Sequence, residues 1–245
     1  MLTVFVLSVA GRAEVFKIKG WGTEPKKEAA RDKASGQPLW SSEIKVEKFK
    51  QDGKTYLYIT DVGSGIYGKD KTFKSWSSAS YYQYVGTTAI PDQGKLVYKD
   101  KNGKVTQTIE KFYNPEKKTV VFRDNGKDTI YDYKQDLIDR ELLGTAISNY
   151  PFDEKRDFVF RLLTNEPRIY PMTLKYIGEE TLKVNNKDVV CYKVQMIPDL
   201  GVLNLLGAFV PKTYFWETKA EHEFIRYEGL ESGLGTPYIV IEATN

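Results

Sequence analysis

The stretch that decides the fold is residues 96–133, LVYKDKNGKVTQTIEKFYNPEKKTVVFRDNGKDTIYDY, in which β-branched and aromatic residues alternate with charged ones. Asn102-Gly103 and Asn125-Gly126 interrupt this alternation, and Asn114-Pro115 marks a further turn between them. Asn-Gly favours a type I′ turn because both central residues need positive φ, which matches the twist of paired strands. The stretch therefore predicts an antiparallel meander.

The same pattern extends outward in both directions. Upstream, Asp52-Gly53 separates two strand-like runs, and downstream Asn185-Asn186 is predicted to turn one strand back on the next. Short alternating segments predict further strands at residues 158–163, 172–177, 189–197, 214–216, 224–227 and 238–243. No linker-like composition separates the two halves, so we expect residues 14–245 to form a single domain.

Residues 136–149, DLIDRELLGTAISN, follow a different period. Leu137, Ile138, Leu142 and Ile147 form an apolar stripe at helical spacing, with Asp136 as the predicted cap. A single striped helix in a β-rich chain is expected to pack on the concave face of the sheet. The predicted fold class is thus mainly β, with one strongly curved antiparallel sheet or incomplete barrel wrapped around this helix.

The composition excludes several classes of function. The chain has 245 residues, 41% of them hydrophobic and 28% charged, and its net charge is 36 − 33 = +3. This basic excess is too small and too dispersed to indicate nucleic-acid binding. A single cysteine, Cys191, and a single histidine, His222, exclude an internal disulfide and any site that needs two imidazoles. We expect no metal and no cofactor.

Residues 1–13 resemble the end of a secretory signal. The apolar run at residues 2–10 has the length of a signal h-region and is too short to cross a membrane as a helix. Small residues that suit cleavage follow it, but no basic residue precedes it. We expect a truncated signal peptide and a periplasmic or outer-membrane-associated protein, with a buried first strand as the alternative.

Two motifs are compatible with chemistry but do not support it. Residues 63–68, GSGIYG, match the letters of a dinucleotide-binding motif, yet no helical stripe follows them. We interpret them as a loop between strands, and residues 20–37, rich in glycine and charge, as another loop. His222 lies in a predicted exposed turn and Cys191 lies in mid-strand, where a buried inert thiol is typical. The protein is therefore not expected to be an enzyme, and a hydrolase is the least favoured alternative.

Residues 200–210, LGVLNLLGAFV, are the most apolar stretch outside the predicted strands. Two interpretations stay open: a plug in the core, or a lid over an apolar cavity that contacts acyl chains. For the second, the predicted ligand-binding residues are Leu200, Val202, Leu203, Leu205, Leu206, Phe209, Leu142 and Trp216.

The clusters of lysine near the turns either attract anionic lipid headgroups weakly or protect edge strands, and we favour the second role. The expected partner is a hydrophobic small molecule or acyl chain, with weak membrane-surface contact as a further possibility, and we expect a monomer. The alternative is a structural or interaction protein of the cell envelope whose core is filled by its own side chains.

The C-terminal half resembles a family of uncharacterised bacterial envelope proteins. The similarity lies in the helical stretch 136–149, in YPFD at 150–153 leading to DFVFRL at 157–162, and in MTLKYIGEETLKV at 172–184. That family is similar in turn to periplasmic lipoprotein carriers and outer-membrane lipoprotein receptors of the LolA/LolB type. The resemblance implies a half-barrel around a helix with an apolar cavity, and it implies no catalytic residues.

Overall fold

The computed structural model describes residues 14–22, 24–199, 211–233 and 235–244. The described chain forms one sheet, one α-helix, α1 (Arg140–Ser148), and a short 3₁₀ helix, η1 (Phe152–Glu154). The strands are β1 (Lys26–Asp32), β2 (Pro38–Gln51), β3 (Lys54–Tyr67), β4 (Thr72–Val85), β5 (Thr88–Lys99), β6 (Val105–Asn114), β7 (Thr119–Asp124), β8 (Lys127–Asp132), β9 (Leu137–Asp139), β10 (Phe158–Leu163), β11 (Ile169–Val184), β12 (Lys187–Pro198), β13 (Thr213–Thr218), β14 (Phe224–Leu230) and β15 (Tyr238–Thr244).

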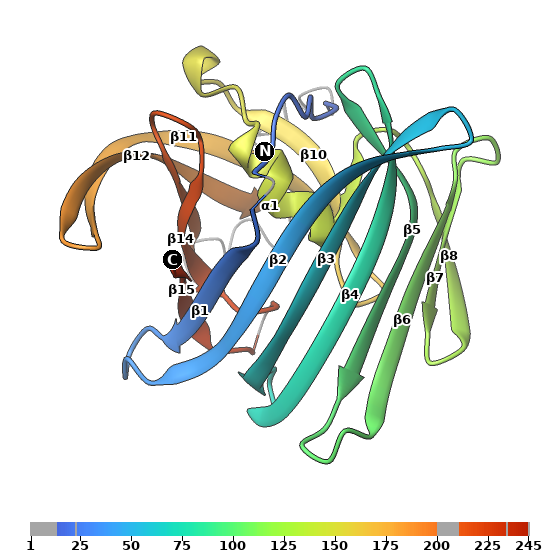
Figure 1. Ribbon diagram of the computed structural model, residues 1–245, viewed down its shortest axis with the longest axis horizontal. Coiled ribbons are helices and arrows are strands. Elements are labelled where there is room, and N and C mark those ends of the chain that lie inside the picture. The colour runs from blue at the N-terminus through green and yellow to red at the C-terminus, as the bar shows by residue number, and fades with distance from the viewer. Residues whose placement is uncertain (1–13, 23, 200–210, 234, 245) are drawn as a thin grey trace, which may run out of the picture.

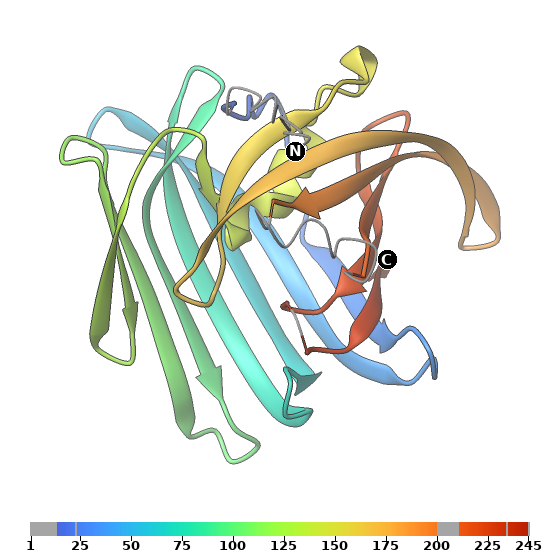
Figure 2. The same ribbon diagram turned by 180° about the vertical axis from the view of Figure 1, so that it is seen from behind.

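The strands follow one another in a simple order, β8-β7-β6-β5-β4-β3-β2-β1-β15-β14-β13-β12-β11-β10-β9. Every pairing is antiparallel except that of β9 with β10, which is parallel. β1 pairs with β15, so the two ends of the described chain meet in the middle of the sheet. The sheet curls without closing into a barrel, and α1 lies on its concave side (Figures 1 and 2). The predicted fold class is confirmed.

The predicted hairpins are present. Asp52-Gly53, Asn125-Gly126 and Asn185-Asn186 each have two consecutive residues with positive φ, as a type I′ turn requires. Asn102-Gly103 lies instead in a longer loop between β5 and β6, where the Asp100 side chain accepts hydrogen bonds from two backbone amides. Local turn chemistry therefore sets the register of the long strands.

Two predicted loops are wrong. Residues 20–37 contain β1, which the sequence pattern hides because its partners β2 and β15 come from opposite ends of the chain. Residues 63–67 of the glycine-rich motif continue β3. A side chain at Gly63 would have its Cβ 2.2 Å from the indole of Trp76, so glycine lets this ring lie across the strand.

The helix begins later than the sequence predicts. Residues 137–139 form β9, α1 starts at Arg140, and its N-cap is Asp139, whose side chain accepts a hydrogen bond from the Leu142 amide. Asp136, the predicted cap, forms a bidentate ion pair with Arg161 on β10 instead, with bonds of 2.8 and 2.9 Å. A strong side-chain partner elsewhere in the fold thus removes Asp136 from capping.

Two apolar clusters occupy the concave face. The first surrounds α1 and includes Leu142 and Ile147 together with Leu57 and Ile59 of β3. The second lies further along the same strands and is rich in aromatic residues. Its members include Trp40, Tyr67, Trp76, Tyr98, Tyr113 and Phe122. The boundary between these clusters is where the candidate site lies.

Candidate functional site

A cavity of about 2640 Å³ lies on the concave side of the sheet. It is lined by residues of α1 and of strands from both halves of the chain. Pockets for small ligands commonly measure about 300–1,000 Å³, so this cavity has room for a much larger molecule. Its apolar wall includes Ile44, Val46, Ile59, Leu96, Leu143, Phe158, Leu162, Met172, Met196, Phe215 and Ile241.

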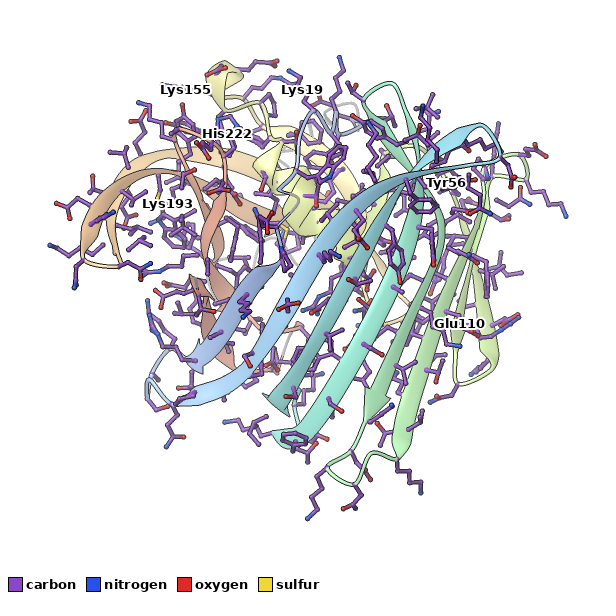
Figure 3. All side chains as sticks on the ribbon, viewed as in Figure 1. Lys19, Tyr56, Glu110, Lys155, Lys193 and His222 are labelled. Atoms are coloured by element: carbon purple, nitrogen blue, oxygen red, sulfur yellow. The ribbon has the colours of Figure 1, made fainter. Side chains whose placement is uncertain are left out.

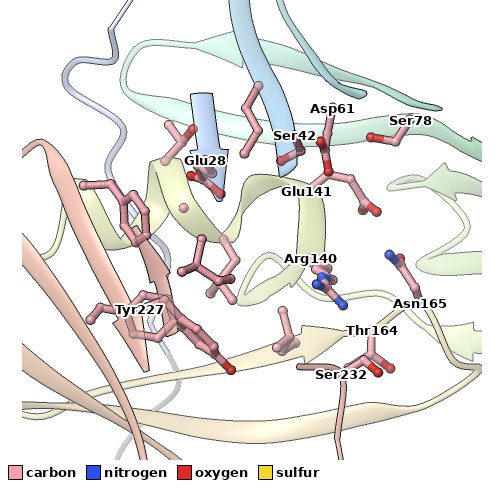
Figure 4. A pocket seen from close by; sticks show the side chains of 18 of the residues that line it. Glu28, Ser42, Asp61, Ser78, Arg140, Glu141, Thr164, Asn165, Tyr227 and Ser232 are labelled. Atoms are coloured by element: carbon pink, nitrogen blue, oxygen red, sulfur yellow. The ribbon is translucent and has the colours of Figure 1, made fainter. Parts of the chain in front are cut away.

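A row of polar side chains crosses this wall from β1 to β4 (Figure 4). Glu28 of β1 lies opposite Ser42 of β2 in the strand register, and Asp61 of β3 lies opposite Ser78 of β4. All four side chains line the cavity and lie between the two apolar clusters. Neither Ser78 Oγ nor Asp61 Oδ1, both buried atoms, has a hydrogen-bond partner among the described residues. We call these four residues the polar row.

The two acids of the polar row bind protons more tightly than ordinary carboxyl groups. Burial, together with the negative charge of Asp61, raises the pKa of Glu28 to about 7. Burial likewise raises the pKa of Asp61 to about 6, although Trp76 Nε1 donates a 3.1 Å hydrogen bond to its Oδ2 atom. The charge of the cavity wall therefore changes close to neutral pH.

The start of α1 is fixed to the sheet by buried hydrogen bonds. Asp139 Oδ1 accepts from the Tyr82 hydroxyl at 2.5 Å, and Oδ2 accepts from the Tyr113 hydroxyl at 3.3 Å. Two residues later, Glu141 forms a buried ion pair with Lys111 at 2.6 Å. Burial alone would raise the pKa of Glu141, but the Lys111 charge and hydrogen bond hold it below its ordinary value.

Arg140 lies between these two anchored residues and faces the cavity (Figure 4). Its Nη1 atom donates to the Tyr67 hydroxyl at 3.1 Å, and the nearby hydroxyls of Tyr67 and Tyr98 raise its pKa further above an already high value. No carboxylate of a described residue lies within 4 Å of its guanidinium nitrogens. Arg140 could not be predicted from the sequence, because the pattern around a cation in the first turn of a helix does not show which residues will surround it.

The structure places the predicted ligand-binding residues in three different settings. Leu142 is buried in the first apolar cluster beneath α1, while its neighbour Leu143 lines the cavity. Trp216 points to the other face of β13, where it packs with Leu182 and Cys191, and its neighbour Phe215 lines the cavity instead. The predicted residues Leu200, Val202, Leu203, Leu205, Leu206 and Phe209 lie outside the described residues.

Of the two side chains weighed for catalysis, His222 lines the cavity and Cys191 packs with Leu182 and Trp216. The His222 ring packs against Phe152 and Tyr192, with ring centroids 4.7 and 5.6 Å apart, near Lys155 at one end of the molecule (Figure 3). Cys191 is buried, and burial raises the pKa of its thiol to about 11, so the thiol is neutral at physiological pH.

The described part of the chain contains neither a cluster of metal ligands nor a helix that could span a membrane. No group of three or more His, Cys, Asp or Glu side chains there is arranged to hold a metal ion. Likewise, α1 and η1 lack the length and apolar character of a membrane-spanning helix.

Comparisons with known proteins place the chain among proteins without an assigned activity. The family model described as "Protein of unknown function (DUF3108)" matches residues 76–228, more than half of the chain. No curated protein matches this chain significantly.

Among solved structures, a β-barrel-like protein of the domain of unknown function DUF1849 from Brucella abortus superposes with a TM-score of 0.53 at 8% identity, covering 92% of this chain and 98% of that one. A Bacteroides fragilis protein described as having a YmcC-like fold gives a TM-score of 0.36 at 10% identity, with 94% and 97% coverage. The hypothetical lipoprotein YmcC from Escherichia coli gives 0.30 at 8% identity, with 92% and 90% coverage. The Brucella structure supports the fold alone.

Proposed function

We propose that this chain, which belongs to the DUF3108 family of proteins of unknown function, binds a hydrophobic ligand such as a lipid or an acyl chain without transforming it. The observation that carries the proposal is the cavity of about 2640 Å³ with its largely apolar wall. A concave hollow of this size with apolar side chains on its wall has room for a long apolar chain. Each buried methylene group contributes about 0.8 kcal/mol, which gives a long chain a substantial gross binding free energy.

The curved sheet suits this role because it supplies one continuous concave wall. Phe215 and Met196 approach the cavity from the C-terminal half of the chain, and Ile44 and Ile59 approach it from the N-terminal half. The resemblance of the C-terminal half to an envelope family that is similar in turn to lipoprotein carriers is part of the proposal. We further propose that the protein works in the bacterial cell envelope, on the basis of its signal-like residues 2–10.

The first experiment asks whether the natively purified protein carries a ligand. The protein is extracted with organic solvent, and the extract is analysed by mass spectrometry. The delipidated protein is then titrated with the fluorescent fatty acid 11-(dansylamino)undecanoic acid. We expect a co-purified lipid and saturable uptake of the probe. Absence of both would contradict the proposal.

Gly144 provides a matched pair of variants for the same titration. It lies on α1, lines the cavity, and has no atom within 4 Å of the position of an added Cβ. Alanine and tryptophan both remove the helix cost of glycine, but only tryptophan places a large ring in the cavity. Gly144→Trp should weaken probe binding at least about tenfold, equivalent to 1.4 kcal/mol, whereas Gly144→Ala should leave it unchanged.

The alternative function, a structural or interaction protein with a self-filled core, makes an opposite prediction for Leu206. If residues 200–210 contact a ligand, Leu206→Asp should abolish probe uptake without unfolding the protein. If they fill the core, the same change should destabilise it sharply, because it buries a charge. Probe titration and urea unfolding of this variant therefore separate the two functions.

A further inference from the structure

We propose that Arg140 binds the anionic head group, a carboxylate or a phosphate, of the amphiphile whose apolar chain occupies the cavity. This inference rests on the proposed function and names the class of ligand that the same cavity takes. Arg140 is one of several cations that line the cavity, and it stands at the start of α1 between Asp139 and Glu141, whose side chains are buried (Figure 4).

The guanidinium of Arg140 has unused hydrogen-bonding capacity. An arginine side chain offers five N–H donors, and the described residues supply one acceptor, the Tyr67 hydroxyl at 3.1 Å. Two of the acids around Arg140 are engaged by other partners, whereas Asp61 and Glu28 interact with it at longer range. Glu141 pairs with Lys111, and Glu231 accepts hydrogen bonds from Trp40 Nε1 and the Gly68 amide, at 2.8 and 2.6 Å. A charge taken out of water without a close counter-ion is costly, and a bound anion would offset that cost.

Buried contacts of its two neighbours in the chain hold the backbone of Arg140 in place. The residues on either side of it, Asp139 and Glu141, are both buried at the side chain and are held by Tyr82 and Lys111. The guanidinium fork is therefore presented from a fixed backbone, and its planar geometry matches the two oxygens of a carboxylate or phosphate. The apolar wall formed by residues such as Leu143 and Phe215 would then receive the chain.

The acids of the polar row do not oppose an anion strongly. Burial raises the pKa of Glu28 to about 7 and that of Asp61 to about 6, so both are largely protonated in mildly acidic solution. Lys26 also faces Glu28, and Arg140 is flanked by the pair Glu141–Lys111, by the hydrogen-bonded Glu231, and by the hydroxyls of Tyr67, Tyr98 and Tyr227. A bound anion would raise the pKa of Glu28 and Asp61 further, and binding should therefore take up protons and tighten from pH 8 to pH 6.

The test compares four amphiphiles that share a sixteen-carbon chain. Palmitate, hexadecyl phosphate, 1-hexadecanol and hexadecyltrimethylammonium each displace the dansylated probe from the wild-type protein. Palmitate or hexadecyl phosphate should bind at least about tenfold more tightly than hexadecanol, as expected for charge-assisted hydrogen bonds. The ratio between the two anions identifies which head group is preferred. Equal binding of anion and alcohol, or tightest binding of the cation, would overturn the inference.

Variants assign the effect to Arg140. Arg140→Gln should reduce the preference for the anion over hexadecanol about tenfold or more while leaving hexadecanol binding within about twofold. Arg140→Lys should recover part of the preference, because it keeps the charge without the fork. Arg168→Gln is the matched control, since Arg168 lines the same cavity but is exposed. An equal loss in Arg168→Gln would assign the preference to the general field of the cavity and contradict the inference.

The outcomes separate this inference from the proposed function. Failure of all four amphiphiles to displace the probe, together with no uptake of the probe itself, contradicts the proposed function. Binding of hexadecanol as tightly as palmitate leaves the proposed function standing and contradicts only the role of Arg140. If Arg140→Gln does not fold, the head-group series on the wild-type protein still decides.

Discussion

The concave face of the sheet has two regions that the same strands build differently. Under α1, β3 presents Leu57 and Ile59, which pack with the apolar side of the helix. Further along, the same face of β3 presents Asp61, which lines the cavity. The apolar stretch of β3 ends at Ile59, and the next inward residue along the strand is Asp61, whose buried Oδ1 atom has no hydrogen-bond partner among the described residues. This change from apolar to polar side chains along β3 indicates that a ligand would bind beside Asp61.

The largest expected effect is a difference in stability between alanine variants of two adjacent leucines on α1. Leu142→Ala should destabilise the protein by about 3 kcal/mol because Leu142 is fully buried in the covered region. Leu143→Ala should cost about 1 kcal/mol, because this side chain faces the cavity, but it should weaken probe binding more. Urea unfolding and probe titration of both variants measure the contrast. Similar stability losses would mean that the two regions do not differ in packing.

A second prediction concerns the close approach of Trp76 to β3. Gly63→Ala should destabilise the protein by about 2 kcal/mol, because the new Cβ would lie 2.2 Å from the indole and 2.7 Å from the Ser41 carbonyl oxygen. Gly144→Ala, in open space on α1, serves as the control and should stabilise by up to about 1 kcal/mol. Thermal unfolding of the two variants should move in opposite directions, and a shift in the same direction would contradict this account of the strand.

A third prediction uses the acids of the polar row. The pKa of Glu28 is about 7 in the folded protein, above its ordinary value of 4.5, so folding favours the protonated form. The stability that this proton provides is complete below about pH 4.5 and is lost as the pH rises through 7. Glu28→Gln should therefore stabilise the protein by roughly 2 kcal/mol at pH 8 and have little effect at pH 4.5.

The control for this comparison is Glu43→Gln, at an exposed position on β2. It should change stability by less than about 0.5 kcal/mol at either pH. Urea unfolding at pH 4.5 and pH 8 supplies the measurement. An effect of Glu28→Gln that is the same at both pH values would mean that Glu28 keeps an ordinary pKa.

The smallest expected effect concerns the cap of α1. Asp136→Asn should leave the start of the helix in place and cost about 1 kcal/mol, because asparagine keeps one acceptor oxygen for Arg161 in this mostly buried pair. Asp139→Asn changes the true cap within a buried network and should cost more. A larger loss for Asp136→Asn in urea unfolding would restore Asp136 as the structurally important acid.

The hairpins could be predicted from the sequence because their cause is local. Asn125-Gly126 and Asn185-Asn186 determine their own backbone conformation, whatever the rest of the chain does. Strand β1 could not be predicted in the same way, since its partner β15 lies about two hundred residues away and its own residues are mostly charged or small. Long-range pairing overrides local composition there.

The candidate site was predicted only in outline. A helix on the concave face of a curved sheet was expected and is present. The sequence pattern did not show which of two neighbouring residues faces the cavity. Leu143 faces it rather than Leu142, and Phe215 faces it rather than Trp216. Arg140 and the polar row become recognisable only when distant strands bring them around one cavity, because their significance lies in what surrounds them.

The most direct test of the central claim is a crystal structure of the protein with 12-bromododecanoic acid, located by the anomalous signal of bromine. The account predicts bromine inside the cavity beside apolar side chains such as Ile59 and Phe215, with the carboxylate at Arg140. Bromine bound only on the outer face of the sheet, or a cavity that excludes the ligand at saturating concentration, would contradict it.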